Sequence, residues 1–99
     1  MQEQVNDFID KYCLHINEQI RYIDLVSEIG ELGKEIIKGT DYGKQEYAPT
    51  SDINGELGDC LFSLFALCCE MDVDAQEVLQ QALSKYEERF RQKGSIGSE

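Results

Sequence analysis

Four acidic residues occur in two pairs, and the members of each pair are three residues apart. Glu28 and Glu31 form the first pair, and Glu56 and Asp59 form the second. Residues three apart on an α-helix project from the same face, so each pair can point at one small volume. Two such helices packed side by side would gather four negative charges, which repel strongly unless a cation lies among them. The spacing therefore indicates a site for a hard divalent cation such as Mg²⁺, which prefers oxygen ligands.

Apolar periodicity predicts two long helices that carry these pairs. The first runs from Ile16 to about Lys38 and ends at Gly39, and the second runs from Asp52 to Glu70. The acidic stripe of the first helix could be an ordinary solvated face. The second helix is apolar almost all the way round, and Glu and Asp are seldom buried unless paired or bound to metal, so its acidic stripe should face a site. The predicted buried face of the first helix is Leu25, Ile29, Leu32 and Ile36.

Two further elements complete an all-α prediction. A short amphipathic helix is expected from Gln2 to Leu14, and Asp74 should cap a C-terminal helix. A loop from Thr40 to Thr50 joins the long helices, with Thr50 or Ser51 as the cap of the second. The predicted fold is a four-helix bundle in a single domain over residues 1–93, followed by a flexible Gly/Ser-rich tail over residues 94–99. The expected buried face of the last helix is Val78, Leu79, Ala82, Leu83, Tyr86 and Phe90.

Composition excludes several classes of partner. The chain has 20 acidic and 9 basic residues and a formal charge of −11, which disfavours nucleic acid as a partner. A phosphate ligand would need a metal to bridge the like charges. The sequence contains no apolar run long enough for a membrane span and no secretory signal after Met1, so a cytoplasmic protein is predicted.

The cysteines and the single histidine offer weaker signals. Cys13, Cys60, Cys68 and Cys69 include no C-x-x-C pair and no histidine at zinc spacing. They are interpreted as reduced core residues of a cytosolic protein, in preference to a redox site at the adjacent Cys68 and Cys69. His15 lies at a helix junction, where a surface or capping role is favoured over catalysis.

The chemistry follows from the charge of the four carboxylates. Their −4 would be largely offset by one or two Mg²⁺ ions, and a polyphosphate could then enter the acidic site as a metal complex. Metal ions held in this way polarise phosphoryl oxygens and position a hydroxide for attack. A carboxylate that is not committed to metal can serve as the general base.

The joint pattern resembles the MazG-like nucleotide pyrophosphohydrolases. It consists of E-x-x-E, a gap of 24 residues and E-x-x-D, with Gly30 and Leu32 inside the first motif and Leu57 and Gly58 inside the second. The resemblance also covers residues 40–43 and 85–98. It implies an all-α enzyme that binds Mg²⁺, or Mn²⁺, with acidic residues from two adjacent helices. Such enzymes hydrolyse a nucleoside triphosphate between its α and β phosphates, giving the monophosphate and pyrophosphate.

Carried over by position, the resemblance also assigns roles to individual residues. Glu35 would be an outer ligand or a base that orients water, and Lys85 and Arg89 would contact phosphate or another subunit. Ser27 departs from the pattern, because many relatives have two adjacent acids where this chain has Ser27 and Glu28. The implied metal ligands, which would also be the catalytic residues, are Glu28, Glu31, Glu56 and Asp59.

The resemblance further implies a homodimer or a dimer of dimers whose sites are completed across subunits. The apolar circumference of the helix over residues 52–70 independently predicts a second copy, because a chain of 99 residues can hardly cover it. Phe62, Phe65 or Cys69 are expected to contact that copy.

Several alternatives remain open from the sequence. On the same scaffold the chain could be a phosphoribosyl-ATP pyrophosphohydrolase, or a deoxynucleotide enzyme such as an all-α dUTPase or dCTPase. It could also be a non-catalytic helical oligomer, or a regulator that holds metal and nucleotide without cleavage. Aromatic residues that could stack on a base are Phe8, Tyr12, Tyr22, Tyr42 and Tyr47.

Overall fold

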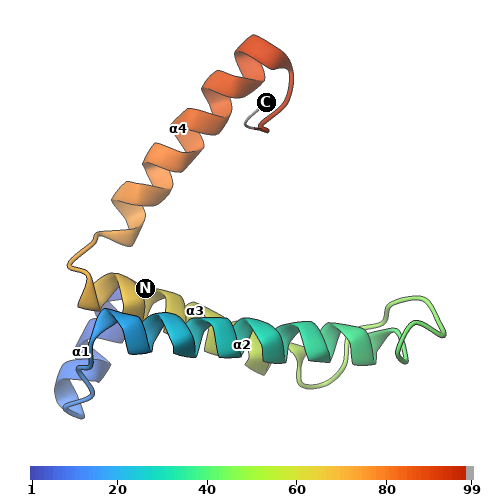
Figure 1. Cartoon of the computed structure of the whole chain (residues 1–99), viewed down its shortest axis with the longest axis horizontal. Helices are drawn as coiled ribbons and strands as arrows, with labels where there is room; N and C mark the ends of the chain where they lie inside the picture. Colours follow the sequence, from blue (N-terminus) through green and yellow to red (C-terminus); the bar gives the residue numbers. More distant parts are fainter. Residues whose placement is uncertain (98–99) are drawn as a thin grey trace.

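The computed structural model describes residues 1–97, and this part of the chain contains four helices and no strand. In chain order they are α1 (Gln2–Lys11), α2 (Glu18–Gly39), α3 (Ile53–Glu70) and α4 (Ala75–Lys93), as Figure 1 shows. The predicted all-α fold with four helices is confirmed. The short first helix ends at Lys11, earlier than expected. The predicted flexible tail includes residues 98–99, which lie outside the described part.

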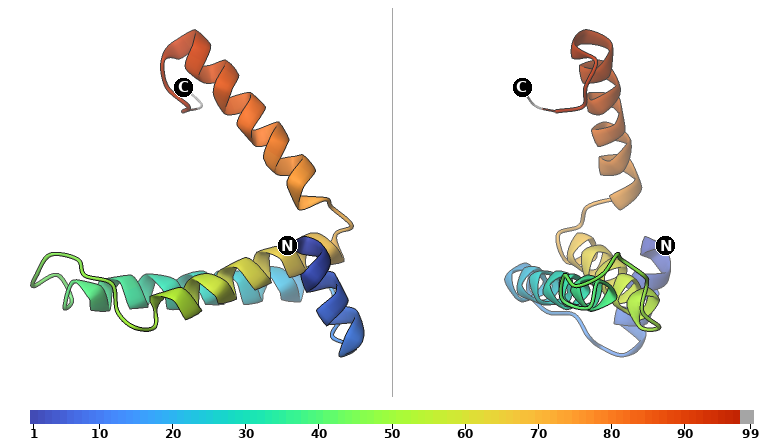
Figure 2. Two further views of the ribbon diagram at one scale, coloured as in Figure 1. Left: turned by 180° about the vertical axis from the view of Figure 1, so that it is seen from behind. Right: turned by 90° about the vertical axis from the view of Figure 1, so that its right-hand side faces the viewer.

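The body of the molecule is an antiparallel pair formed by α2 and α3. The two helices lie side by side in Figures 1 and 2, and α1 packs against α3 near one end of the pair. Phe8 of α1 meets Phe62 of α3 edge to face, with ring centroids 5.8 Å apart. Ile9 and Ala66 are fully buried in this body. Burial of these apolar side chains is the main force that holds α1 against α3.

Two helices begin at side-chain caps that satisfy free backbone N–H groups. Asn17 accepts a hydrogen bond from the N–H of Ile20 at the start of α2. Asp74 accepts hydrogen bonds from the N–H groups of Gln76 and Glu77 at the start of α4. The predicted cap at Asp74 is therefore confirmed.

The start of α3 differs from the prediction. Neither Thr50 nor Ser51 caps this helix, because its cap position is Asp52, which makes no side-chain hydrogen bond to the helix. The hydroxyl of Thr50 instead donates to Glu35 of α2 at 2.6 Å. The predicted cap is therefore wrong, because the neighbouring helix offers Thr50 a carboxylate acceptor that the sequence could not reveal.

Gly39 ends α2 for a steric reason. After the loop turns at Asp41 and Tyr42, both with positive φ, the N–H of Ala48 donates to the carbonyl of Gly39 at 2.9 Å. A Cβ on Gly39 would lie 2.7 Å from the carbonyl oxygen of Ala48 and 2.7 Å from the Tyr47 ring. Gly39 is thus required by the close return of the loop, and it does not adopt a left-handed conformation.

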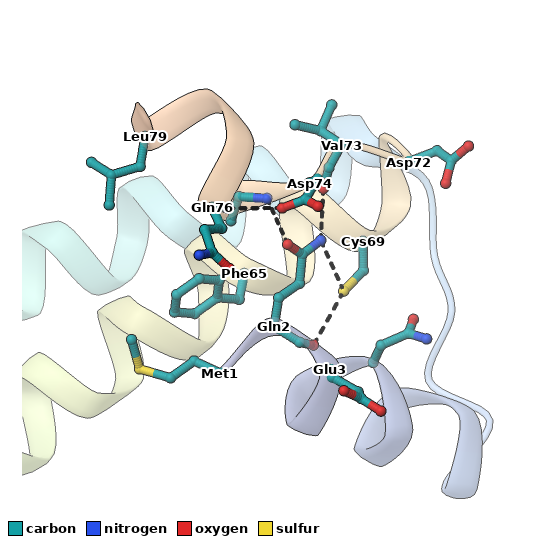
Figure 3. Close-up of a pocket in the computed structure, with 12 residues that line it drawn as sticks. Met1, Gln2, Glu3, Phe65, Cys69, Asp72, Val73, Asp74, Gln76 and Leu79 are labelled. Carbon is teal, nitrogen blue, oxygen red and sulfur yellow. Dashed lines mark hydrogen bonds between the residues drawn. The ribbon is translucent and has the colours of Figure 1, made fainter. Parts of the chain in front are cut away.

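Helix α4 projects away from the body (Figures 1 and 2). None of its residues is buried, so the predicted buried face of this helix is wrong for the single chain, and Phe90 is 60% exposed. The amide of Gln2 holds the corner before α4: it donates to the carbonyl of Val73 and accepts from the N–H of Ala75, both at 2.6 Å (Figure 3). The described part of the chain is therefore open, and the apolar face of α4 stays exposed within residues 1–97.

The outward faces of α2 and α3 also expose apolar side chains. Leu25 and Leu32 are half-buried as predicted, but Ile29 is 53% exposed and Ile36 is 43% exposed. A two-helix body can cover only one side of each helix, so this part of the predicted buried face is wrong for one chain. On α3 the exposed apolar residues are Leu57, Leu61 and Leu64.

The four cysteines are all free. Cys13 is exposed and follows α1 with a positive φ of 54°, so its assignment to the core is wrong. Cys60, Cys68 and Cys69 are half-buried on α3. Burial is the main cause that raises the pKa of each of these three thiols, which disfavours the reactive thiolate. Across residues 1–97, no helix is both long and apolar enough to span a membrane.

Candidate metal centre

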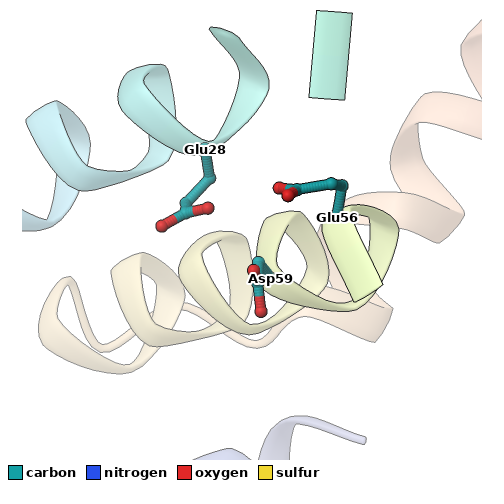
Figure 4. Close-up of side chains that lie close together, drawn as sticks. All are labelled: Glu28, Glu56 and Asp59. Carbon is teal, nitrogen blue, oxygen red and sulfur yellow. The ribbon is translucent and has the colours of Figure 1, made fainter. Parts of the chain in front are cut away.

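Three of the four predicted ligands meet between the two long helices. Glu28 comes from α2, and Glu56 and Asp59 come from α3 (Figure 4). One carboxylate oxygen from each residue lies within 4.8 Å of the others. Glu28 and Glu56 are half-buried and Asp59 is exposed, so the cluster opens to solvent on one side. We call these three residues the carboxylate cluster.

Helical spacing explains why the cluster faces the body of the molecule. Along α3, Glu56 and Asp59 share a stripe with Ser63 and Ala66, and the last two are buried. The buried half of the stripe fixes the rotation of α3, so the acidic half must also turn inward, toward α2. The acidic half of this stripe thus faces α2 and the carboxylate of Glu28, and its role as a functional site stays a prediction.

The cluster lacks protein cations. Within residues 1–97, none of the salt bridges involves Glu28, Glu56 or Asp59. Burial raises the pKa of Glu56, and the charges of Asp59, Glu31, Glu28 and Glu35 add to the effect in that order. No cation among the described residues forms a salt bridge with this negative charge, which favours a bound metal ion. The salt-bridged acids are Asp10, Glu35, Glu70, Glu87 and Glu88.

Glu31 lies close to the cluster without joining it. It is exposed on α2 and is not among the residues whose oxygens meet within 4.8 Å. Its charge nevertheless raises the pKa of Glu56, and among the neighbouring acids only Asp59 has a larger effect on that pKa. The predicted set of four is therefore a group of three with a fourth carboxylate beside it.

Glu35 occupies a different environment from the other acids. It is 7% exposed, its Oε1 accepts a hydrogen bond from Thr50, and its Oε2 lies 3.7 Å from Nζ of Lys38. Both oxygens thus have protein partners, which suits a fixed outer position better than direct metal binding. The sequence did not identify Thr50 as a partner, because contacts across a loop leave no periodic signal.

Lys85 and Arg89 do not approach the cluster within one chain. Both lie on α4, where Nζ of Lys85 is 5.1 Å from the centre of the Tyr86 ring. Nη1 of Arg89 donates to the carbonyl of Ile96 at 3.4 Å. The structure therefore does not join these predicted phosphate-binding residues to the carboxylates of the same chain.

His15 belongs to a separate cluster at the other end of α3. Its Nε2 lies 2.5 Å from Asp10 and its Nδ1 lies 3.0 Å from Glu70, the last residue of α3. The buried Arg21 also contacts Glu70 at 3.6 Å. Glu70 is about 21 Å along the helix from Glu56, at 1.5 Å per residue. The half-exposed His15 thus has the surface role that the sequence favoured and is remote from the carboxylate cluster.

These observations define an all-α protein with a cluster of three carboxylates between two antiparallel helices. Comparison with known protein families identifies the class of protein. The family model of the MazG nucleotide pyrophosphohydrolase domain matches residues 17–93. The chain belongs to this family, which confirms the resemblance seen in the sequence. No curated protein and no solved structure matches the chain. The matched region contains both acidic pairs and α4, and the family typically uses a divalent metal.

Proposed function

We propose that the chain is a Mg²⁺-dependent nucleoside triphosphate pyrophosphohydrolase. It cleaves between the α and β phosphates of ribo-, deoxyribo- or non-canonical nucleotides and releases the monophosphate and pyrophosphate. One observation carries this proposal beyond family membership: Glu28, Glu56 and Asp59 gather carboxylate oxygens within 4.8 Å of one another. No protein cation is paired with them in residues 1–97.

The donor set fits a hard divalent ion. All three donors are carboxylates. Among the residues that the structure describes, no cysteine or histidine joins this group of donors, so a softer metal is not favoured. Glu28, Glu56 and Asp59 would hold Mg²⁺ or Mn²⁺, with Glu31 beside them. When bound, the ion polarises phosphoryl oxygens and makes water a better nucleophile at neutral pH. Asp59 is exposed, so in this proposal the substrate approaches the ion from that side.

The neighbouring carboxylates can handle the proton of the attacking water. Hydrolysis adds the oxygen of water to a phosphorus atom, breaks the bridging P–O bond and releases one proton. Glu31 is exposed and outside the cluster, so in our proposal its carboxylate accepts that proton. Glu35 is held by Thr50 and Lys38, so it acts as an outer residue that keeps the site in place.

A second copy of the chain supplies what one chain lacks. The apolar residues of α4 and the outward face of α3 are exposed in the single chain, including Phe90 and Leu61. Burial of such faces favours association. A homodimer or a dimer of dimers would cover them and would allow Lys85 and Arg89 to reach a phosphate at the cluster of a partner. Within residues 1–97, neither side chain forms a salt bridge with the carboxylate cluster of its own chain.

The test is pyrophosphate release from a panel of canonical and modified nucleoside triphosphates and phosphoribosyl-ATP, with Mg²⁺ or with chelator. Wild type is compared with Glu56→Gln, which removes one charge of the cluster, and with Glu46→Gln, an exposed acid in the loop. We expect metal-dependent release from wild type and Glu46→Gln and its loss in Glu56→Gln.

Two results would change the proposal. If only phosphoribosyl-ATP releases pyrophosphate, the chain is a phosphoribosyl-ATP pyrophosphohydrolase on the same scaffold. No release from any compound, in a folded protein that still binds metal and nucleotide, would overturn catalysis and indicate a binding role.

A further inference from the structure

The loop between α2 and α3 turns after Gly39 and returns along α2, and two hydrogen bonds join its returning part, residues 43–52, to that helix. The first is the hydrogen bond from the N–H of Ala48 to the carbonyl of Gly39, at 2.9 Å. The second is the hydrogen bond from Oγ1 of Thr50 to Oε1 of Glu35, at 2.6 Å. Because α3 begins at Ile53, the contact of Thr50 is the last of these attachments before that helix starts.

The Thr50 contact has a well-defined geometry. The side chain of Glu35 is 8% exposed, and a buried carboxylate is unfavourable unless it accepts hydrogen bonds. Thr50 supplies a short bond to a charged acceptor, a type stronger than a neutral hydrogen bond. The other neighbour, Lys38, is 3.7 Å away with a side chain that is 43% exposed. Thr50 is therefore the closer of the two partners that hold this carboxylate.

Helix geometry places this contact in register with the carboxylate cluster. Glu28 and Glu35 are seven residues apart on α2, so they share a face and lie about 10.5 Å apart along the axis. Helix α3 runs antiparallel, and Glu56 follows Thr50 by six residues. The Glu35–Thr50 bond and the Glu28–Glu56 approach are thus successive contacts between the same two segments.

We propose that Thr50 is a positioning residue for the metal centre. Through its bond to Glu35 it holds the start of α3 against α2, so that the carboxylates of Glu56 and Asp59 meet that of Glu28. This inference rests on the proposed function, which makes the cluster a metal site. The absence of a side-chain cap bond from Asp52 supports it, because no such bond fixes the first turn of α3 from within the helix.

The test measures Mn²⁺ binding by calorimetry on the full chain without nucleotide. Thr50→Val removes the hydroxyl and keeps the shape, and Thr50→Ser restores a hydroxyl. Thr40→Val is the matched control, because Thr40 makes hydrogen bonds to Ile37 and Gly43 at the other end of the same loop. We expect Thr50→Val to weaken Mn²⁺ binding about tenfold, as loss of outer partners commonly does. Thr50→Ser and Thr40→Val should bind as wild type does.

A second pair of variants tests the same bond from α2. Glu35→Leu removes the acceptor, whereas Glu35→Gln removes the charge but keeps an oxygen that can accept from Thr50. Weaker Mn²⁺ binding by Glu35→Leu than by Glu35→Gln supports the proposal, even if Thr50→Val does not fold. Where Thr50→Val folds, it should add no further loss in the Glu35→Leu background.

The inference and the proposed function fail in different ways. If wild type binds Mn²⁺ and both Thr50→Val and Glu35→Leu bind it equally well, Thr50 does not position the site. If Thr50→Val lowers thermal stability far more than Thr40→Val and binds Mn²⁺ normally, its role is structural only, which also overturns the inference. If wild type itself binds no Mn²⁺, the metal centre and thus the proposed function are wrong.

Discussion

Glu28 on α2 and Glu56 on α3 each place a carboxylate oxygen within 4.8 Å of the other, and an oxygen of Asp59 lies within the same distance of both. Repulsion among these charges opposes the packing of α2 on α3, and a bound cation would remove it. We therefore predict that Mg²⁺ stabilises the fold. At a Mg²⁺ concentration 100 times the dissociation constant, the free energy of unfolding should rise by about 2.7 kcal/mol.

Thermal unfolding with Mg²⁺ or chelator, at fixed protein concentration, measures this gain. Glu28→Gln should lose most of the stabilisation by Mg²⁺, because the variant removes a metal donor. When both proteins are in chelator, the variant should unfold at a higher temperature than wild type, because it also removes repulsion. Glu46→Gln should behave as wild type does in both buffers. Equal melting temperatures of wild type with Mg²⁺ and with chelator would contradict the prediction.

His15 should titrate above its ordinary range. The pKa of His15 is raised from 6.5, first by the hydrogen bond with Asp10 and then by the one with Glu70. The folded state therefore binds a proton more tightly than the unfolded state. The resulting stability is fully present below pH 6.5 and is lost as the pH rises through the folded pKa.

NMR titration of the imidazole measures this pKa directly, because the chain contains one histidine. Asp10→Asn should lower the pKa of His15, and by more than Glu70→Gln does. The carboxylate cluster lies at the far end of α3, so Glu56→Gln should leave the titration unchanged and serves as the control. A wild-type pKa at or below 6.5 would show that the two hydrogen bonds do not form in solution.

Substitution by alanine at Gly39 and at Gly30 should change the free energy of unfolding in opposite directions. A Cβ on Gly39 would lie 2.7 Å from the carbonyl of Ala48, so Gly39→Ala should lower the free energy of unfolding by about 1–3 kcal/mol. Gly30 lies on the same helix, and a Cβ there would meet no side chain or other segment within 4 Å. Gly30→Ala should therefore raise the free energy of unfolding by up to about 1 kcal/mol. Chemical denaturation of both variants provides the measurement. A Gly39→Ala variant as stable as wild type would show that the loop does not return so closely.

The sequence predicted the helices and the inward acidic stripe because both are encoded by local spacing. Glu56 and Asp59 lie three residues apart on one face, whatever packs against them. Contacts between segments leave no such signal. The bond of Thr50 to Glu35 depends on the path of a loop, and a threonine beside a predicted helix is typical of a cap.

The last helix shows a second limit of periodicity. The spacing of Leu79, Leu83 and Tyr86 predicts a buried face, but it cannot say whether the same chain buries that face. In the structure α4 projects from the body with no buried residue. Patterns within one chain do not distinguish a partner within the molecule from a second copy.

Helix α4 has no buried residue in its own chain, so we expect it to act at the site of a second subunit. If α4 of one chain supplies Arg89 to the cluster of another, two inactive variants should complement each other. Glu56→Gln lacks a working cluster but keeps α4 intact, whereas Arg89→Ala keeps the cluster. Random pairing of equal amounts in a dimer gives one working site in each mixed dimer, so about a quarter of wild-type pyrophosphate release should return.

The measurement is release after the two variants are unfolded together and refolded. Mixing Glu56→Gln with Asp59→Asn is the matched control, because both substitutions damage the same cluster and no pairing restores it. Recovery with Arg89→Ala and none in the control would place α4 of one chain at the site of its partner. If Arg89→Ala is inactive and no activity returns although mixed oligomers form, Arg89 serves the site of its own chain, and α4 must fold back in solution.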